Sequence, residues 1–67
     1  MDIQTEKMLK EAKVEKIIDS WLITWYYEGE RYYLNIDNNF DTNSNILHFE
    51  YELDAKTYLA VLNSQGL

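Results

Sequence analysis

The alternation of apolar and polar residues is clearest in the middle of the chain, where residues 21–36 predict a β-hairpin. A two-residue turn at Glu28–Gly29, in which glycine accepts a positive φ, sets the register of the two strands. This register gathers one apolar set on a single face: Trp21, Ile23, Trp25, Tyr27, Tyr32, Leu34 and Ile36. The opposite face receives Leu22, Thr24, Tyr26, Arg31, Tyr33 and Asn35. A shift of one residue in either strand would mix the two sets, so the pattern favours this pairing.

The C-terminal part of the chain predicts a strand followed by a helix. Residues 46–53 alternate, and the residues expected to face the core are Leu47, Phe49, Tyr51 and Leu53. Asp54 is a favourable N-cap for the helix, and Gly66 suits the C′ position that ends it. The helix then has one apolar stripe, formed by Ala55, Tyr58, Leu59 and Leu62. Residues 37–45 are polar and are expected to form a loop.

The N-terminal part of the chain allows more than one interpretation. Residues 4–13 predict a helix with Met8, Leu9 and Ala12 on one face. A second stripe of helical spacing lies roughly opposite to the first and consists of Val14, Ile17, Ile18 and Trp21. The helix could break near Lys13, residues 14–19 could belong to the first strand, or two helix faces could both be covered in an oligomer. We expect the helix to continue to about Ile18.

The predicted fold is therefore α+β, with an N-terminal helix, a three-stranded antiparallel β-meander and a C-terminal helix. A chain of 67 residues fits one small domain, here residues 1–67. A domain of this size buries only about 60% of the surface that its unfolded chain exposes. Aromatic residues make up 15% of the sequence, and their large side chains can supply much of the core.

Composition and charge exclude several classes of protein. The chain has no cysteine, so it is neither a disulfide scaffold nor a thiolate metal site. The charged N-terminus lacks the apolar segment of a signal peptide, and no apolar run approaches the roughly 18 residues of a membrane span. We therefore expect a cytoplasmic protein that makes no membrane contact. The formal net charge of −6, without a basic patch, argues against direct binding of DNA or RNA.

The candidate catalytic and metal-binding residues lack the partners that their chemistry needs. Asp37, Asn39, Asp41, Asn43 and Asn45 have the alternate spacing of a calcium loop. The sixth position is Thr42 instead of glycine, however, and the twelfth is His48 instead of glutamate. The only histidine, His48, has Glu50 two residues away but no nucleophile motif near it. We expect no enzymatic activity, no cofactor and no metal.

The outward face of the predicted sheet is the strongest candidate for a binding site. Tyrosine and arginine are enriched at binding hot spots, and acidic residues at a rim can attract a basic partner. The candidate protein-binding residues are Leu22, Tyr26, Arg31, Tyr33, Glu50 and Glu52. A second set, Glu28, Glu30, Asp37 and Asp41, could imitate the phosphates that a nucleic-acid-handling protein binds.

These observations favour a small acidic protein-binding module that inhibits or adapts another protein. A sharper hypothesis is a decoy that mimics nucleic acid, since the size and charge of the chain are similar to those of small phage-type inhibitors. The alternative is a structural homo-oligomer, assembled through the N-terminal helix or through the exposed outward face of the sheet. We call this face, which carries Tyr26 and Tyr33, the tyrosine face. The partner would then be a second copy, whereas the first hypothesis requires a different protein, basic or nucleic-acid-handling.

Overall fold

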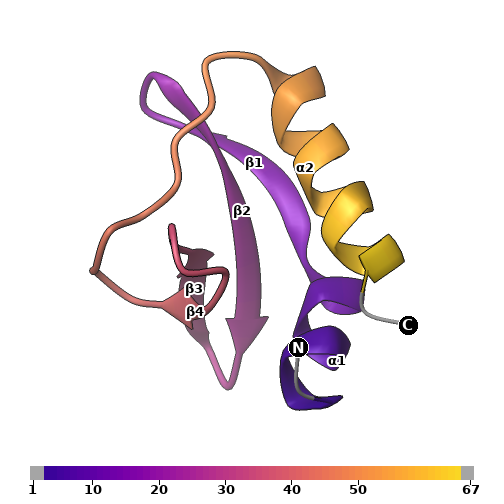
Figure 1. Cartoon of the computed structure of the whole chain (residues 1–67). Helices are drawn as coiled ribbons and strands as arrows, with labels where there is room; N and C mark the ends of the chain where they lie inside the picture. The colour runs from indigo at the N-terminus through magenta and orange to yellow at the C-terminus, as the bar shows by residue number, and fades with distance from the viewer. Residues whose placement is uncertain (1–2, 66–67) are drawn as a thin grey trace.

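The computed structural model describes the backbone of residues 3–65 and the side chains of residues 7–65. Two helices flank a four-stranded antiparallel meander in which the strands are neighbours in chain order (Figure 1). The elements are α1 (Ile3–Glu11), β1 (Lys13–Ile17), β2 (Ser20–Tyr27), β3 (Glu30–Leu34), β4 (Phe40–Asp41) and α2 (Glu52–Gln65). The α+β class, the terminal helices and the antiparallel meander are as predicted, but the sheet has one strand more. Among the described helices, none combines the length and the apolar character needed to cross a membrane.

The prediction of a helix to Ile18 is wrong, because α1 ends at Glu11 and β1 follows. The carbonyl of Leu9 accepts hydrogen bonds from the Ala12 amide at 3.4 Å and from the Asn63 side chain of α2 at 3.2 Å. These donors satisfy a carbonyl that the helix would otherwise leave without a partner at its end. The two apolar stripes then belong to two elements, and Leu9 and Val14 both pack into the same core. The strand alternative for residues 14–19 thus holds for 14–17.

The β2–β3 hairpin has the predicted register near its turn. Trp25 pairs with Tyr32, and Tyr27 pairs with Glu30. The turn residues Glu28 and Gly29 both have positive φ, at 48° and 80°, as a type I′ turn requires. The positive φ angles of these two turn residues set the register of the hairpin, and the register determines which side chains share a face.

The hairpin register does not continue as predicted beyond Tyr33. The Leu34 carbonyl accepts a hydrogen bond from the Leu47 amide at 3.0 Å, and Trp21 forms an antiparallel bridge with Phe49. The segment before α2 therefore pairs with the ends of β2 and β3. Ile36, which was predicted to lie on the apolar face of the hairpin with Trp21, is exposed instead.

The predicted strand over residues 46–53 is wrong, because this segment makes only isolated bridges, at Ile46 and at Phe49. Leu47 and Phe49 pack against the core as expected, but Tyr51 and Leu53 are exposed. The helix α2 begins at Glu52, two residues before the predicted N-cap. Gly66, its predicted C′ residue, lies outside the described residues.

The strand beside β3 is β4, which forms inside the segment predicted to be a loop. The Asn35 side-chain oxygen accepts hydrogen bonds from the amides of Asp37 and Asn39, both at 3.0 Å. Asn38 has a φ of 62°, a conformation that asparagine tolerates better than most residues. This tight turn brings Phe40 back against Leu34 of β3. A local turn of polar side chains thus supplies the strand that the hydrophobic pattern did not show.

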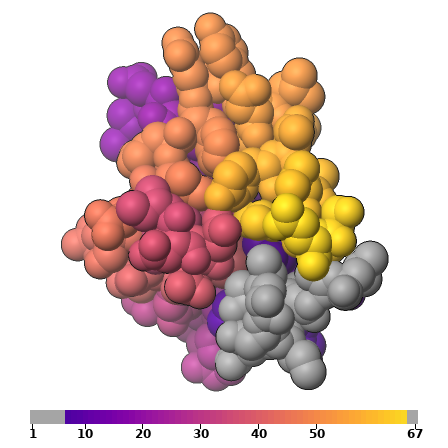
Figure 2. Space-filling model, viewed as in Figure 1, coloured from indigo at the N-terminus to yellow at the C-terminus, as the bar shows by residue number. Residues whose placement is uncertain are grey.

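One hydrophobic core joins the helices to the sheet. Its fully buried residues are Leu9, Ile23, Leu34, Ala55 and Leu62. Figure 1 shows α2 lying along β1 and β2, with α1 beside its C-terminal end. In the space-filling view the segment after β4 and α2 lie side by side, while the β1–β2 turn projects at the upper left (Figure 2). The helices cover β1 and β2, and the tip of the β2–β3 hairpin extends beyond α2.

Candidate functional site

The predicted tyrosine face lies on the side of the sheet opposite the hydrophobic core. Tyr26 and Arg31 are cross-strand neighbours, as predicted. Two contacts of a cation with an aromatic ring lie on this face. Lys13 lies 4.6 Å from the ring centre of Tyr26, and Arg31 lies 5.3 Å from that of Tyr33. Arg31 also donates a hydrogen bond from Nε to the Tyr33 hydroxyl at 2.9 Å. The hydroxyl groups of Tyr26 and then Tyr33 raise the pKa of Arg31, which stays cationic.

Glu15 is a central residue of this face that the sequence did not reveal. Its Oε1 atom accepts hydrogen bonds from the Thr24 hydroxyl at 2.5 Å and from the Tyr26 hydroxyl at 2.7 Å. These donors, Thr24 first, lower the pKa of Glu15 below its usual value of 4.5, because they stabilise the charged form. The helical assignment of residues 14–18 hid Glu15. The alternation of Lys13 and Glu15 with Val14 was the signal for a strand.

Leu22 was expected on the exposed face, and this placement is wrong, since only 6% of its surface is accessible. The reason is β1, which places Glu15 directly opposite Leu22 and makes β2 an inner strand. Side chains of an inner strand are shielded by neighbours on both sides. Leu22 therefore belongs to the folded interior and offers no contact to a partner.

Glu50 and Glu52 are exposed but do not join the tyrosine face. Glu50 follows Phe49, which bridges to Trp21 at the start of β2. Trp21 and Tyr26 are five residues apart in the same strand, a distance of about 17 Å. Glu52 lies in the first turn of α2 and pairs with Lys56 at 3.1 Å. The predicted shared face fails because residues 46–53 do not form a strand.

The four residues of the predicted decoy surface are not gathered into one cluster. Glu28 and Glu30 lie at the turn that begins β3, and both are exposed. Asp37 follows the other end of β3, and Asp41 is half-buried in β4, where it accepts a hydrogen bond from the Thr42 amide. Within the described part of the chain, no three potential ligands among histidine and carboxylate groups come close enough to hold a metal ion.

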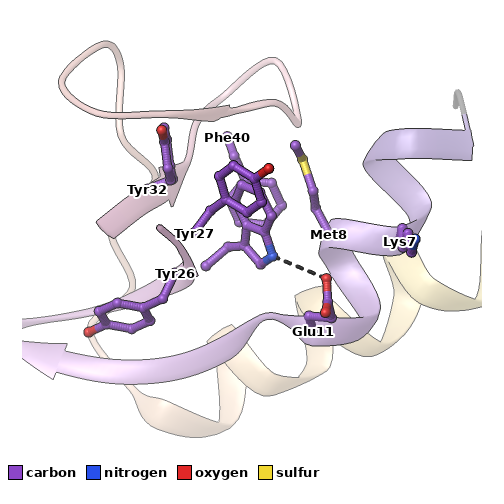
Figure 3. Close-up of a pocket in the computed structure, with 8 residues that line it drawn as sticks. Lys7, Met8, Glu11, Tyr26, Tyr27, Tyr32 and Phe40 are labelled. Atoms are coloured by element: carbon purple, nitrogen blue, oxygen red, sulfur yellow. Dashed lines mark hydrogen bonds between the residues drawn. The ribbon is translucent and has the colours of Figure 1, made fainter. Parts of the chain in front are cut away.

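A groove lies between α1 and the hairpin tip, and the sequence pattern did not predict it. We call it the aromatic groove; it has a volume of about 620 Å³ and is lined by Lys7, Met8, Glu11, Trp25, Tyr26, Tyr27, Tyr32 and Phe40. Figure 3 shows Met8 and Glu11 reaching from α1 toward the rings, whereas the Tyr26 ring points away. Three of its aromatic residues were predicted as core, and Phe40 was assigned to a loop.

Trp25 is the centre of the aromatic groove. Its ring lies 5.2 Å from that of Tyr27 at an interplanar angle of 12°, so the two rings are stacked. Tyr32 and Phe40 approach Trp25 in tilted geometry, at 5.4 and 6.0 Å. The Trp25 indole donates a long hydrogen bond of 3.4 Å to Glu11, the dashed line in Figure 3. The ring contacts and this hydrogen bond connect the hairpin tip to α1.

The sequence shows the aromatic residues of this groove, but their position between α1 and the hairpin tip depends on the tertiary structure. Trp25, Tyr27 and Tyr32 share one face of the hairpin, and α2 packs on β1 and β2 away from the hairpin tip. Phe40 was also the single aromatic residue within a polar segment. Comparison of the chain with protein families, curated proteins and solved structures finds no match.

Proposed function

We propose that this chain is a non-enzymatic protein-binding module, an inhibitor or adaptor of another protein, and that it binds through the aromatic groove. The observation that carries this proposal is the open aromatic surface at the hairpin tip. Tyr27 leaves 52% of its surface accessible although it stacks on Trp25. Tryptophan and tyrosine dominate binding hot spots because they bury a large area at a small entropic cost.

The groove supports binding better than the predicted tyrosine face does. On that face the polar groups already satisfy one another, since Glu15 accepts from Thr24 and Tyr26, and Arg31 bonds to Tyr33. A partner would have to replace these interactions. In the groove, by contrast, a partner gains contact with aromatic surface that now faces water. Met8 at the wall adds a side chain that can adapt to different shapes.

The test is capture of a partner from host lysate by the tagged chain, with mass spectrometry of the bound proteins. We expect one near-stoichiometric partner for the wild type, and loss of that partner for Tyr27→Ala. Tyr51→Ala is the matched control, because it removes an exposed tyrosine far from the groove and should retain the partner. Retention of the partner by Tyr27→Ala would place the binding site elsewhere. Release of the partner by added duplex DNA would favour the decoy hypothesis.

The homo-oligomer hypothesis loses its main support. It rested on two apolar stripes that one helix could not bury within a single chain. In the structure Leu9 and Val14, one from each stripe, pack into the same core of one chain. Light scattering on the purified protein tests this point, and we expect the mass of a monomer.

A further inference from the structure

Three aromatic residues of the groove, Trp25, Tyr27 and Tyr32, differ from Tyr26 and Tyr33 in one respect. On the tyrosine face, Lys13 and Arg31 each lie over a tyrosine ring. Within the part of the chain whose side chains are described, no such cation lies over Trp25, Tyr27 or Tyr32. The negative faces of aromatic rings attract cations, most strongly where water is partly excluded. The groove therefore offers unoccupied ring faces of the kind that bind a cation.

Carboxylates lie next to these rings. Glu11 lines the groove from α1. Glu30 is the direct cross-strand partner of Tyr27, so the side chains of Glu30 and Tyr27 lie on the same face of the sheet. Among residues 7–65 the single ion pair joins Lys56 to Glu52, which leaves Glu11 and Glu30 without a cationic partner there. Lys7 contributes one opposing charge to the lining. The chain as a whole carries a net charge of −6, which adds attraction for a cation.

We propose that the aromatic groove receives an arginine side chain from a basic segment of the partner protein. This inference rests on the proposed function and specifies the chemistry of the partner. Trp25 and Tyr27 are stacked at 12°, and Tyr27 is half exposed. A planar guanidinium continues such a stack on the free face of Tyr27, with the Glu30 carboxylate beside it. Arginine fits better than lysine, because its guanidinium is planar, less strongly hydrated and able to stack while it bonds a carboxylate.

The size of the groove agrees with a segment of chain. Its volume of about 620 Å³ lies within the roughly 300–1,000 Å³ range of ligand sites. One side chain does not fill that space, so flanking residues of the partner would pack against Met8 and Phe40. The aromatic and apolar walls thus provide contact area, and the cation provides orientation and selectivity.

The experiment uses two blocked pentapeptides, Ala-Gly-Arg-Gly-Ala and the same peptide with citrulline at the centre. Citrulline has nearly the shape of arginine but no charge. Titrations into the full 15N-labelled chain are followed through the Trp25 indole and the Tyr27 and Glu30 amides. We expect the arginine peptide to bind about tenfold more tightly than the citrulline peptide. This difference should shrink between about 10 mM and about 1 M salt, because salt screens the carboxylates.

Variants that should change the peptide affinity in opposite directions separate the effect of charge from nonspecific apolar binding. Glu11→Gln and Glu30→Gln should each weaken the arginine peptide about two- to fivefold, whereas Lys7→Gln should strengthen it by a similar factor. Glu50→Gln is the matched control, because it changes the net charge equally at a position remote from the groove. Tyr27→Leu keeps an apolar side chain but removes the ring, and it should lower the preference for arginine. The spectrum of each variant verifies that it is folded.

Two results would overturn the inference and leave the proposed function standing. One is equal binding of the arginine and citrulline peptides in the groove, which indicates an apolar or proline-rich partner. The other is no groove response to either peptide while partner capture still depends on Tyr27. Groove resonances that move with protein concentration alone would instead identify a second copy as the occupant and overturn both proposals.

Discussion

Replacement of Ile18 tests the backbone conformation of the β1–β2 turn. Ile18 lies in this turn with a φ of 58°, the left-handed region, and 89% of its surface is accessible. A β-branched residue is a strong outlier there, and the left-handed conformation costs about 1–2 kcal/mol for a residue with a side chain. Glycine removes that strain but adds about 0.5–1 kcal/mol of unfolded-chain entropy. Since almost no burial is lost, Ile18→Gly should stabilise the fold by about 0.5–1 kcal/mol.

This gain should raise the melting temperature by about 2–8 °C, since 1 kcal/mol shifts a domain of this size by about 4–8 °C. Thermal and urea unfolding followed by circular dichroism measure the change. Ile18→Asn should also stabilise, because asparagine tolerates positive φ without the entropy of glycine. Ile18→Val is the matched control: it keeps the branch at Cβ and should leave stability within about 0.5 kcal/mol. Glycine and asparagine variants that melt at or below the wild-type temperature would refute the strained turn.

Three further substitutions test the placement of individual side chains. Leu22→Ala should destabilise the fold by about 2–3 kcal/mol in urea unfolding because Leu22 is buried, and a change below about 0.5 kcal/mol would show it to be exposed. Trp25→Ala should cost about 2–3 kcal/mol, less than a fully buried tryptophan, and an unchanged urea midpoint would remove Trp25 from the centre of the groove. The lowered pKa of Glu15 stabilises the fold above the usual value of 4.5, and this contribution is lost as the pH falls through the lowered folded-state value. The stability advantage of wild type over Glu15→Gln should therefore be full at neutral pH and shrink below pH 4.5, whereas a pH-independent difference would contradict the hydrogen bonds from Thr24 and Tyr26.

The sequence allowed the hairpin to be predicted because two local signals agree there. The period of two in residues 21–34 and the glycine at the turn both require the same register. The region of 13–17 was ambiguous because Val14, Ile17 and Ile18 fit a helical spacing as well as a strand. The distinction depends on a partner strand and on the Asn63 bond to the end of α1, which is a contact across 54 positions.

The alternation of residues 46–53 misled for a different reason. Alternation predicts a strand only where a neighbouring strand offers hydrogen bonds over the same length. Here Phe49 finds a partner in Trp21, but the next residues enter α2. The strand that pairs with β3 is β4. The turn before β4 is held by hydrogen bonds to the Asn35 side chain, and the hydrophobic pattern of the sequence gives no sign of these bonds.

The candidate site was predictable in its residue types but not in its location. Aromatic residues and acidic neighbours were recognised as binding features, and they were assigned to the face opposite the core. Burial of Leu22 and the mutual bonding of Glu15 and Tyr26 close part of that face. Because α1 is short and α2 lies over β1 and β2, the aromatic surface left open is the one that was predicted to be core.

The most direct test of the aromatic groove as a protein-binding site is site-specific photocrosslinking. A benzophenone amino acid replaces Tyr27 in one sample and the exposed Tyr51 in another, and both are irradiated in host lysate. We expect one dominant crosslinked protein from position 27, joined through a segment that contains arginine, and none from position 51. A chain that crosslinks to no protein from position 27, or equally from both positions, would contradict the assignment of the groove.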